Sequence, residues 1–231
     1  MKLLQEKLEF LLDKYSVDTQ VTLKDRQTIV IKGEELPLLA HRSELRFIEL
    51  NNMVTGGTLT GISVMRTMRI LEKGADLYEA LYRELDLCQF MLQRAIKSIT
   101  VMANGNVMNV IATTADGVVC TLELAATLAA GEQPKDKHEI IAAHGIACDI
   151  VVDAQLKQDS IYVFGANGNA AYTDVDFELY GLSIEDIAVV REAFAIARDK
   201  TSEEMKAIDA NLRALVALAK KSANSGEREV L

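Results

Sequence analysis

The chain has 231 residues, of which 49% are hydrophobic, and carries a formal net charge of −9 at pH 7. This length is enough for one large domain, or one domain with a small extension, and for a sizeable core. The acidic balance argues against nucleic acid as a partner, because phosphate binding requires a basic surface. No apolar run approaches the length of a membrane-spanning helix, so we expect no membrane span.

The cysteines and the start of the chain indicate the compartment. Cys88, Cys120 and Cys148 are odd in number, widely spaced and flanked by apolar residues. This pattern is typical of buried thiols in a reducing environment. Charged residues interrupt the apolar ones within Met1–Lys7, which is not the pattern of a secretion signal. We therefore expect a cytoplasmic protein.

The first third of the chain mixes helical and extended patterns. Apolar residues at helical spacing predict a helix over residues 3–15, and alternation over 20–24 and 28–32 predicts a hairpin. Residues 45–50 have the composition of a strand. The pattern over residues 58–93 predicts a helix that is broken near Gly74 and restarts at Asp76, a suitable N-cap residue.

From Lys97 the hydrophobic period changes to two, which indicates strands. The segments with this period are 99–103, 107–114, 117–125, 138–144, 147–152 and 160–164. The turns between them are short, which predicts a largely antiparallel sheet. Ser183 with Asp186, and Thr201 with Glu204, have the spacing of capping boxes and predict two helices that close the chain.

The predicted strands are apolar on both faces, as in residues 117–125 and 138–144. A sheet with one solvated face would alternate more strictly, so both faces need a cover. Helices cover one face, and a second copy of the chain is the simplest cover for the other. A dimer and a tetramer both satisfy this requirement, and packing of the N-terminal segment on the sheet is the alternative. We expect an α+β fold: an open, mostly antiparallel sheet with helices on one face over residues 45–231, and a helix-plus-hairpin extension over residues 1–44.

Three stretches resemble the C-terminal domain of the glucose–fructose oxidoreductase, inositol dehydrogenase and MocA (Gfo/Idh/MocA) family. They are YRELDL at 82–87, HEIIAAHG at 138–145 and AKKSANSG at 219–226. The resemblance covers about residues 81–231 and concerns scaffold more than chemistry. It implies a domain that binds substrate and forms the assembly in NAD(P)-dependent sugar and cyclitol dehydrogenases.

The resemblance also implies an acid–base site on the predicted helix that follows Asp76 and precedes the series of strands from Lys97 onward. Family members have an Asp, a His four residues later and then Asp-Leu. Here Asp86-Leu87 matches, whereas Glu79 stands at the first position and Arg83 at the His position. Arginine stays protonated and cannot exchange a proton as histidine does, and the family's Glu-Lys-Pro motif is missing. Arg83 and Glu79 therefore form either a surface ion pair or a ligand site in which Arg83 holds a carboxylate or phosphate.

No cofactor site is predicted from the sequence. A dinucleotide requires a glycine-rich turn between a strand and a helix, and neither Gly56–Gly61 nor Gly165–Gly168 has that pattern. His41, His138 and His144 lack metal-ligand spacing and are interpreted as surface or core-edge residues, so we expect no metal. Tyr162 and Tyr172 belong to an aromatic group that is interpreted either as core or as a platform for a sugar-like ligand.

Together these features suggest an oxidoreductase-like protein without a nucleotide-binding domain. The expected role is a non-catalytic, homo-oligomeric subunit that binds a small molecule or serves assembly, alone or beside a full-length dehydrogenase. The alternative is an oxidoreductase subunit that acts on a sugar-like or cyclitol substrate with a nucleotide-binding partner supplied in trans. A scaffold without any ligand is the third option.

Overall fold

The computed structural model describes residues 1–152, 158–165, 168–173, 178–179 and 181–231. These residues form two compact units, each built from two separate parts of the sequence. The first unit comprises Met1–Ile48 and Val175–Asn211, and the second comprises Glu49–Asp174 and Leu212–Leu231. The N-terminal segment thus shares a compact unit with a much later part of the chain.

The first unit contains helices around a small antiparallel sheet. Its elements are α1 (Lys2–Lys14), β1 (Val21–Leu23), β2 (Thr28–Ile31), β3 (Glu34–Pro37), the 3-10 helix η1 (Ala40–Ser43), α4 (Ile184–Asp199) and the first part of α5 (Ser202–Ser225). The predicted hairpin is confirmed as β1 and β2, and β3 adds a third strand. Helix α4 contacts both α1 and η1, and the buried Glu192 of α4 accepts a hydrogen bond from Ser43 at 2.7 Å.

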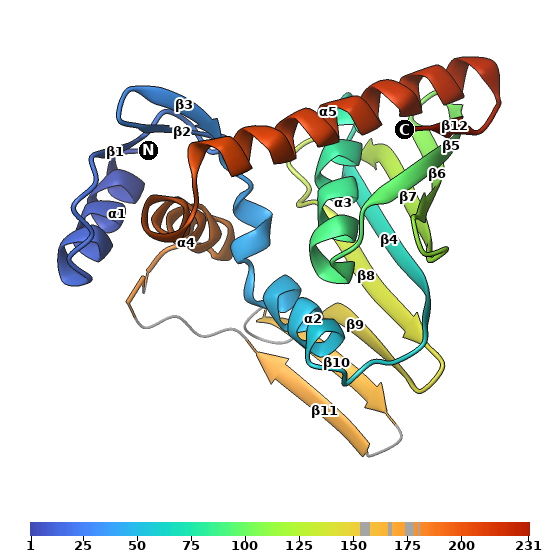
Figure 1. Ribbon diagram of the computed structural model, residues 1–231, viewed down its shortest axis with the longest axis horizontal. Coiled ribbons are helices and arrows are strands. Elements are labelled where there is room, and N and C mark those ends of the chain that lie inside the picture. The colour runs from blue at the N-terminus through green and yellow to red at the C-terminus, as the bar shows by residue number, and fades with distance from the viewer. Residues whose placement is uncertain (153–157, 166–167, 174–177, 180) are drawn as a thin grey trace. The chain divides into compact units, whose positions relative to one another are not determined.

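The second unit is built on a nine-stranded sheet (Figure 1). Its strands are β4 (Ile62–Glu72), β5 (Ile96–Asn104), β6 (Val107–Thr114), β7 (Val119–Leu128), β8 (Lys135–Ala142), β9 (Gly145–Val152), β10 (Gln158–Gly165), β11 (Gly168–Thr173) and β12 (Glu229–Val230). The spatial order is β11-β10-β9-β8-β4-β7-β6-β5-β12, and every pair is antiparallel except β4 with β7. The predicted α+β class with a mostly antiparallel sheet is confirmed.

Helix α3 (Leu77–Leu92) covers one face of this sheet by contacting β4 and β7. The side chains between them form the core, including Leu81, Leu85, Met65 and Leu122, all of which are fully buried. The C-terminal part of α5 lies beside α3, where Lys220 lies over the ring of Tyr78 with its ammonium 4.9 Å from the ring centre. None of the helices within the described residues is both long and apolar enough to cross a membrane.

Two sequence-based predictions in the first third of the chain are wrong. Residues 45–50, predicted as a strand, belong to helix α2 (Leu45–Thr55), whose buried residues Phe47, Leu50 and Met53 follow a helical spacing. The first half of the helix predicted over 58–93 is instead strand β4. This strand lies in the middle of the sheet and has partly buried residues on both faces, so it lacks the alternation typical of a strand.

Candidate functional site

The candidate site begins on the buried side of helix α3. Asp76 caps this helix, its side chain accepting a hydrogen bond from the backbone N–H of Tyr78 at 2.8 Å, as its sequence position predicts. The helix then presents an apolar face to the sheet, but Glu84 lies on that face and is 0% exposed. A carboxylate in such a place requires cationic partners.

The second part of the site is a fork between strands β8 and β9. Their ladder runs from the pair Ala142–Gly145 to the pair Glu139–Cys148 and stops there, whereas β9 continues beside β10 from Asp149 onward. At the end of the ladder, the side chain of Asp149 accepts a hydrogen bond from the backbone N–H of His138. The carboxylate of Asp149 thus replaces a backbone carbonyl where the two strands separate.

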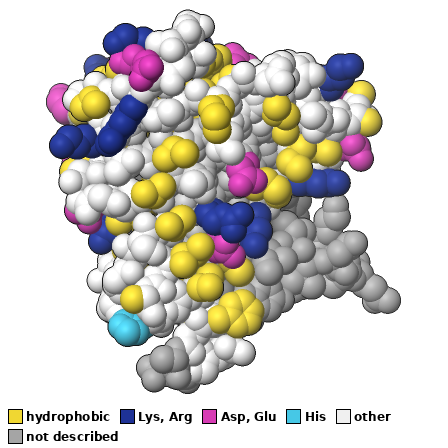
Figure 2. All heavy atoms as spheres, turned by 90° about the vertical axis from the view of Figure 1, so that its right-hand side faces the viewer, with side chains coloured by type: hydrophobic (Ala, Val, Ile, Leu, Met, Phe, Trp, Pro, Cys, Tyr) yellow, Lys and Arg dark blue, Asp and Glu magenta, His cyan; other side chains and the backbone are white. Residues whose placement is uncertain are grey.

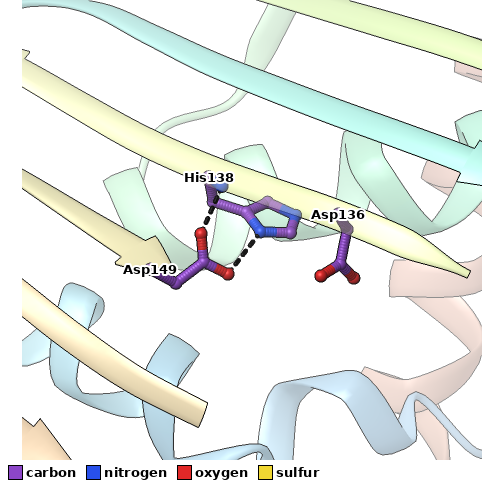
Figure 3. A group of neighbouring side chains, drawn as sticks. All are labelled: Asp136, His138 and Asp149. Atoms are coloured by element: carbon purple, nitrogen blue, oxygen red, sulfur yellow. Dashed lines mark hydrogen bonds and ion pairs between the residues drawn. The ribbon is translucent and has the colours of Figure 1, made fainter. Parts of the chain in front are cut away.

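His138 lies in this fork between two carboxylates. Its Nδ1 is 2.8 Å from Asp149 Oδ2, and its Nε2 is 2.9 Å from Glu84 Oε2. Figure 3 shows both interactions of Asp149 with His138, and the carboxylate of Asp136 on the other side of the ring. His138 and Glu84 are fully buried and Asp149 is 2% exposed, so water does not screen these contacts.

Two arginines complete the network. Arg83 Nη1 lies 2.5 Å from Glu84 Oε1, and Arg83 Nη2 lies 3.6 Å from Asp136 Oδ2. Arg69 of β4 donates to the same oxygen of Asp136 at 2.9 Å. We call the six residues of this network the charge cluster: Arg69, Arg83, Glu84, Asp136, His138 and Asp149.

The charges of the cluster shift the pKa values of its central residues in opposite directions. Burial by itself lowers the pKa of His138, but the neighbouring charges of Asp149 and Glu84 outweigh it and raise the pKa to about 9. Burial likewise raises the pKa of Glu84, but the charges of His138 and Arg83 outweigh it and lower the pKa to about 2. At neutral pH the pair is therefore an imidazolium beside a carboxylate.

With His138 protonated, the cluster is electrically balanced, because the three cations Arg69, Arg83 and His138 match the three carboxylates Glu84, Asp136 and Asp149. Asp136, His138 and Asp149 also bring oxygen and nitrogen atoms within 4.8 Å of one another, which is close enough to hold a metal ion. Both ring nitrogens of His138 already face carboxylates, however, and arginines hold Asp136. In this arrangement the protonated imidazole and the two guanidinium groups, and not a metal ion, neutralise the carboxylates.

The structure places the site residues predicted from the sequence in different environments. Arg83 belongs to the charge cluster and pairs with Glu84 and Asp136, whereas Glu79 is exposed. Asp86 is fully buried on α3. Tyr162 and Tyr172 lie in β10 and β11, and their side chains fall outside the described part of the structure.

The interpretation of His138 as a surface or core-edge residue is wrong, because it is fully buried. Its partners Glu84 and Asp149 and the nearby Asp136 were missed. Two signals were present in the sequence. Asp136 and His138 are two residues apart and so share one face of a strand that continues with the apolar Ile140. Asp149 likewise interrupts an otherwise apolar strand. Charged residues at core positions of neighbouring strands indicate a buried polar network.

Comparison with solved structures shows a fold shared with oxidoreductases. An oxidoreductase from Agrobacterium radiobacter, in complex with NAD+, L-tartaric acid and magnesium, matches with a TM-score of 0.65 and 14% identity, over 84% of this chain and 64% of that one. A levoglucosan dehydrogenase in complex with NADH and levoglucosan matches with a TM-score of 0.63 and 10% identity, over 83% and 65%. An oxidoreductase domain protein from Kribbella flavida matches with a TM-score of 0.63 and 12% identity, over 83% and 65%.

These matches confirm the predicted likeness to the C-terminal domain of Gfo/Idh/MocA-type oxidoreductases at the level of the fold. The chain spans less than two thirds of the length of these solved proteins. No protein-family model matches the sequence, and no curated protein matches it.

Proposed function

We propose that this chain is an oxidoreductase-like domain that binds a small molecule or organises an assembly and does not itself transfer hydride. The observation that carries the proposal is the position of Arg83 within the charge cluster. By resemblance, this residue stands where the dehydrogenases have their acid–base histidine. A guanidinium remains protonated at neutral pH, and here it is paired with Glu84 and Asp136.

His138 does not replace the missing acid–base group. A general acid or base must come within hydrogen-bond reach of the proton that it transfers. His138 is 0% exposed, and both of its ring nitrogens are bonded to carboxylates of the same chain. These contacts favour a structural role, in which the imidazolium holds α3 to the fork between β8 and β9.

The glycine-rich segments also support the proposal, because neither of them has the arrangement of a dinucleotide-binding turn. The segment that contains Gly57 and Gly61 connects the end of helix α2 to strand β4, with φ angles of 74° and 70°. A dinucleotide-binding turn has the opposite order, from a strand to the N-terminus of a helix. Gly165 and Gly168 pair with each other across the β10–β11 hairpin.

We further infer that the protein is homo-oligomeric through the sheet face opposite α3 and resides in a reducing compartment such as the cytoplasm. Exposed hydrophobic side chains on that face, including Met102 and Ile111, support the first point. The three buried cysteines, all present as thiols, support the second.

Calorimetric titration with NAD(H) and NADP(H) tests the lack of hydride chemistry. We expect no binding at millimolar concentrations, and micromolar binding would contradict the proposal. Thermal-shift measurements with myo-inositol, levoglucosan and L-tartrate test ligand binding, because a ligand of the native state raises the melting temperature. Arg198→Lys is the control, because Arg198 belongs to an exposed ion pair outside the cluster. A ligand-induced rise in melting temperature that disappears in Arg83→Lys but persists in Arg198→Lys would assign binding to the cluster.

An alternative is an oxidoreductase subunit that acts on a sugar-like or cyclitol substrate with a nucleotide-binding partner, including a full-length dehydrogenase, supplied in trans. The observation that favours it is the length of the matched proteins whose structures contain NAD+ or NADH. This chain aligns with only 64–65% of each of them, so each has a further part that this chain does not match. NADH oxidation that requires both this chain and a separate nucleotide-binding protein would support the alternative. Retention of that activity in Arg83→Lys would exclude Arg83 from it.

A further inference from the structure

The segment that follows helix α5 turns back and lies along one edge of the nine-stranded sheet. Helix α5 ends at Ser225, and the chain reverses its direction at Gly226, whose φ of 72° is unstrained for a glycine. We call residues 227–231 the tail. They contain strand β12, which pairs with β5 at the end of the sheet (Figure 1). Strand β12 has two residues and β5 has nine, so the ladder itself covers only part of the β5 edge.

Backbone hydrogen bonds hold the tail to this edge. The C=O of Lys97 accepts a hydrogen bond from the N–H of Leu231 at 2.9 Å, and Glu229 lies opposite Ile99 in the antiparallel ladder. An edge strand with unpaired N–H and C=O groups is a template on which another extended segment can pair. The tail therefore occupies a place that would otherwise be open to a different strand.

Ser222 of α5 marks where this place ends. Its side chain is fully buried and accepts a hydrogen bond from the N–H of Val101 at 2.9 Å. The same hydroxyl donates to the C=O of Glu227 at 2.6 Å, so it also fixes the start of the tail. A side chain thus takes the place of a strand at Val101. The part of the edge that accepts an extended segment therefore has a defined length, over residues 97–101.

Successive side chains of the tail are recognised separately, because neighbours in a strand point to opposite faces of a sheet. Nε and Nη2 of Arg228 donate to the Oγ of Ser98 at 2.9 and 2.7 Å, and Ser98 is 1% exposed. Glu229 forms an ion pair of 2.5 Å with Lys221 of α5, and its side chain is 12% exposed. In strand addition, backbone pairing supplies affinity and alternating side-chain contacts supply specificity. These contacts select an arginine followed by a carboxylate.

Other side chains contribute less to this selection. Val230 and Leu231 of the tail are 55% and 56% exposed. Figure 2 shows a face on which hydrophobic side chains surround a group of basic and acidic ones. The sheet face opposite α3 has charged residues on β4, β7 and β8, which include Arg66, Glu123 and Lys135. These strands are at least three places from β12 in the sheet, or roughly 14 Å at the usual strand spacing, so their side chains do not reach the tail.

We propose that the β5 edge over residues 97–101, together with Ser98 and Lys221, is a recognition site for an extended Arg-Glu segment of another protein, and that the tail occupies this site within the chain. The tail is then an intramolecular competitor. A segment tethered beside its site has an effective concentration of about 1 mM or more, so a partner binds well only when the tail is displaced. The inference involves no residue of the charge cluster and does not depend on the proposed absence of hydride chemistry.

A labelled peptide with the sequence of residues 226–231, GEREVL, tests the proposal by fluorescence anisotropy with the full chain. Glu229→Pro removes the carboxylate and the backbone N–H of the tail opposite Ile99, and so releases the tail from β5. We expect the peptide to bind this variant at least about tenfold more tightly than the wild type, in which the tail competes. Far-UV circular dichroism verifies the fold, and Glu229→Ala, which removes only the side-chain contact, is a milder second variant.

Charge exchange at Lys221 tests the specificity of the site. A peptide with lysine in place of its glutamate should bind the Glu229→Pro chain about fivefold more weakly or worse, and Lys221→Glu should restore that binding. A peptide with alanine in place of its arginine should also bind more weakly, because it cannot donate to Ser98. Lys220→Glu is the matched control, since the ammonium of Lys220 lies over the ring of Tyr78, and it should leave the affinities unchanged at physiological salt.

Absence of binding to both tail variants at millimolar peptide would overturn the proposal. Binding to the wild type that is as tight as binding to the variants would overturn the role of the tail as competitor. Equal affinities for the glutamate and lysine peptides would overturn recognition through Lys221. None of these results bears on the absence of hydride chemistry, which the nucleotide titration tests separately.

Discussion

Asp149 receives two hydrogen bonds from one residue, since both the backbone N–H and the ring Nδ1 of His138 face its carboxylate. One carboxylate therefore ends the β8–β9 ladder and fixes the orientation of the imidazole. Glu84 of α3 binds the opposite ring nitrogen, so the same imidazole connects the helix to the sheet. Stability should depend on every member of this connection.

Replacement of Asp149 by alanine should destabilise the protein by about 3–5 kcal/mol. The change leaves a buried imidazolium without one of its counter-charges and a backbone N–H without its acceptor. Urea denaturation measures the difference in the free energy of unfolding. Asp199→Asn, which breaks an exposed pair with Arg198, is the control and should leave the free energy of unfolding nearly unchanged, because solvent screens this pair. A similar small loss in Asp149→Ala would contradict the role of the cluster.

The stability should vary with pH on both sides of a plateau. The pKa of His138 is raised from 6.5 to about 9, so its stabilising contribution is complete below pH 6.5 and disappears as the pH rises through 9. The pKa of Glu84 is lowered from 4.5 to about 2, so its contribution is complete above pH 4.5 and disappears as the pH falls through 2. The cluster should therefore stabilise the fold most between pH 4.5 and 6.5.

The matched variant for this profile is His138→Gln. It lacks the ionisable ring, so the alkaline decline attributed to His138 should be absent from its unfolding free energy. Denaturation at several pH values from about 5 to about 10 checks this expectation. Parallel profiles for the two proteins would show that other groups cause the decline.

The three cysteines should be unreactive in the native state. Cys88, Cys120 and Cys148 are 1%, 0% and 4% exposed. A hydrogen bond with Cys120, followed by burial, raises the pKa of Cys88, and burial raises the pKa of Cys148. Because the thiolate is the reactive form, Ellman's reagent should detect these thiols slowly in native protein and all at once in denaturant. Rapid reaction of a thiol in the native protein would contradict its buried position.

Helix α5 should depend on its capping box. Thr201 Oγ1 accepts a hydrogen bond from the N–H of Glu204 at 3.2 Å, and Glu204 accepts one from the N–H of Thr201 at 2.9 Å. Thr201→Ala should therefore cost about 1 kcal/mol of unfolding free energy. Thr201→Ser keeps the hydroxyl and should restore most of this loss, and equal losses in both variants would show that the cap contributes little.

Local patterns in the sequence were enough to predict β5 to β10 and the two C-terminal helices, because alternating strands and capping boxes are encoded within a few residues. Strand β4 was not predictable in this way. It is hydrogen-bonded to β7 along one edge and to β8 along the other, so its place in the sheet depends on partners more than 45 residues away in the sequence. The division into two units depends in the same way on contacts between distant segments.

The candidate site shows the same limit. Arg83 of helix α3 was identified by resemblance, but its partner Asp136 lies on strand β8, more than 50 residues later. The fork that holds His138 depends on where the β8–β9 ladder ends. A sequence indicates that a charged residue occupies an apolar strand. It does not indicate which residue neutralises that charge.

The central claim is that His138 is an imidazolium held between the buried carboxylates of Glu84 and Asp149. An NMR titration of the His138 imidazole tests it most directly, with His138→Gln used to assign the signal. The account predicts a ring that is protonated on both nitrogens at neutral pH and loses its proton only near pH 9. A ring that is neutral at pH 7.5 and titrates near its ordinary value of about 6.5 would contradict the account.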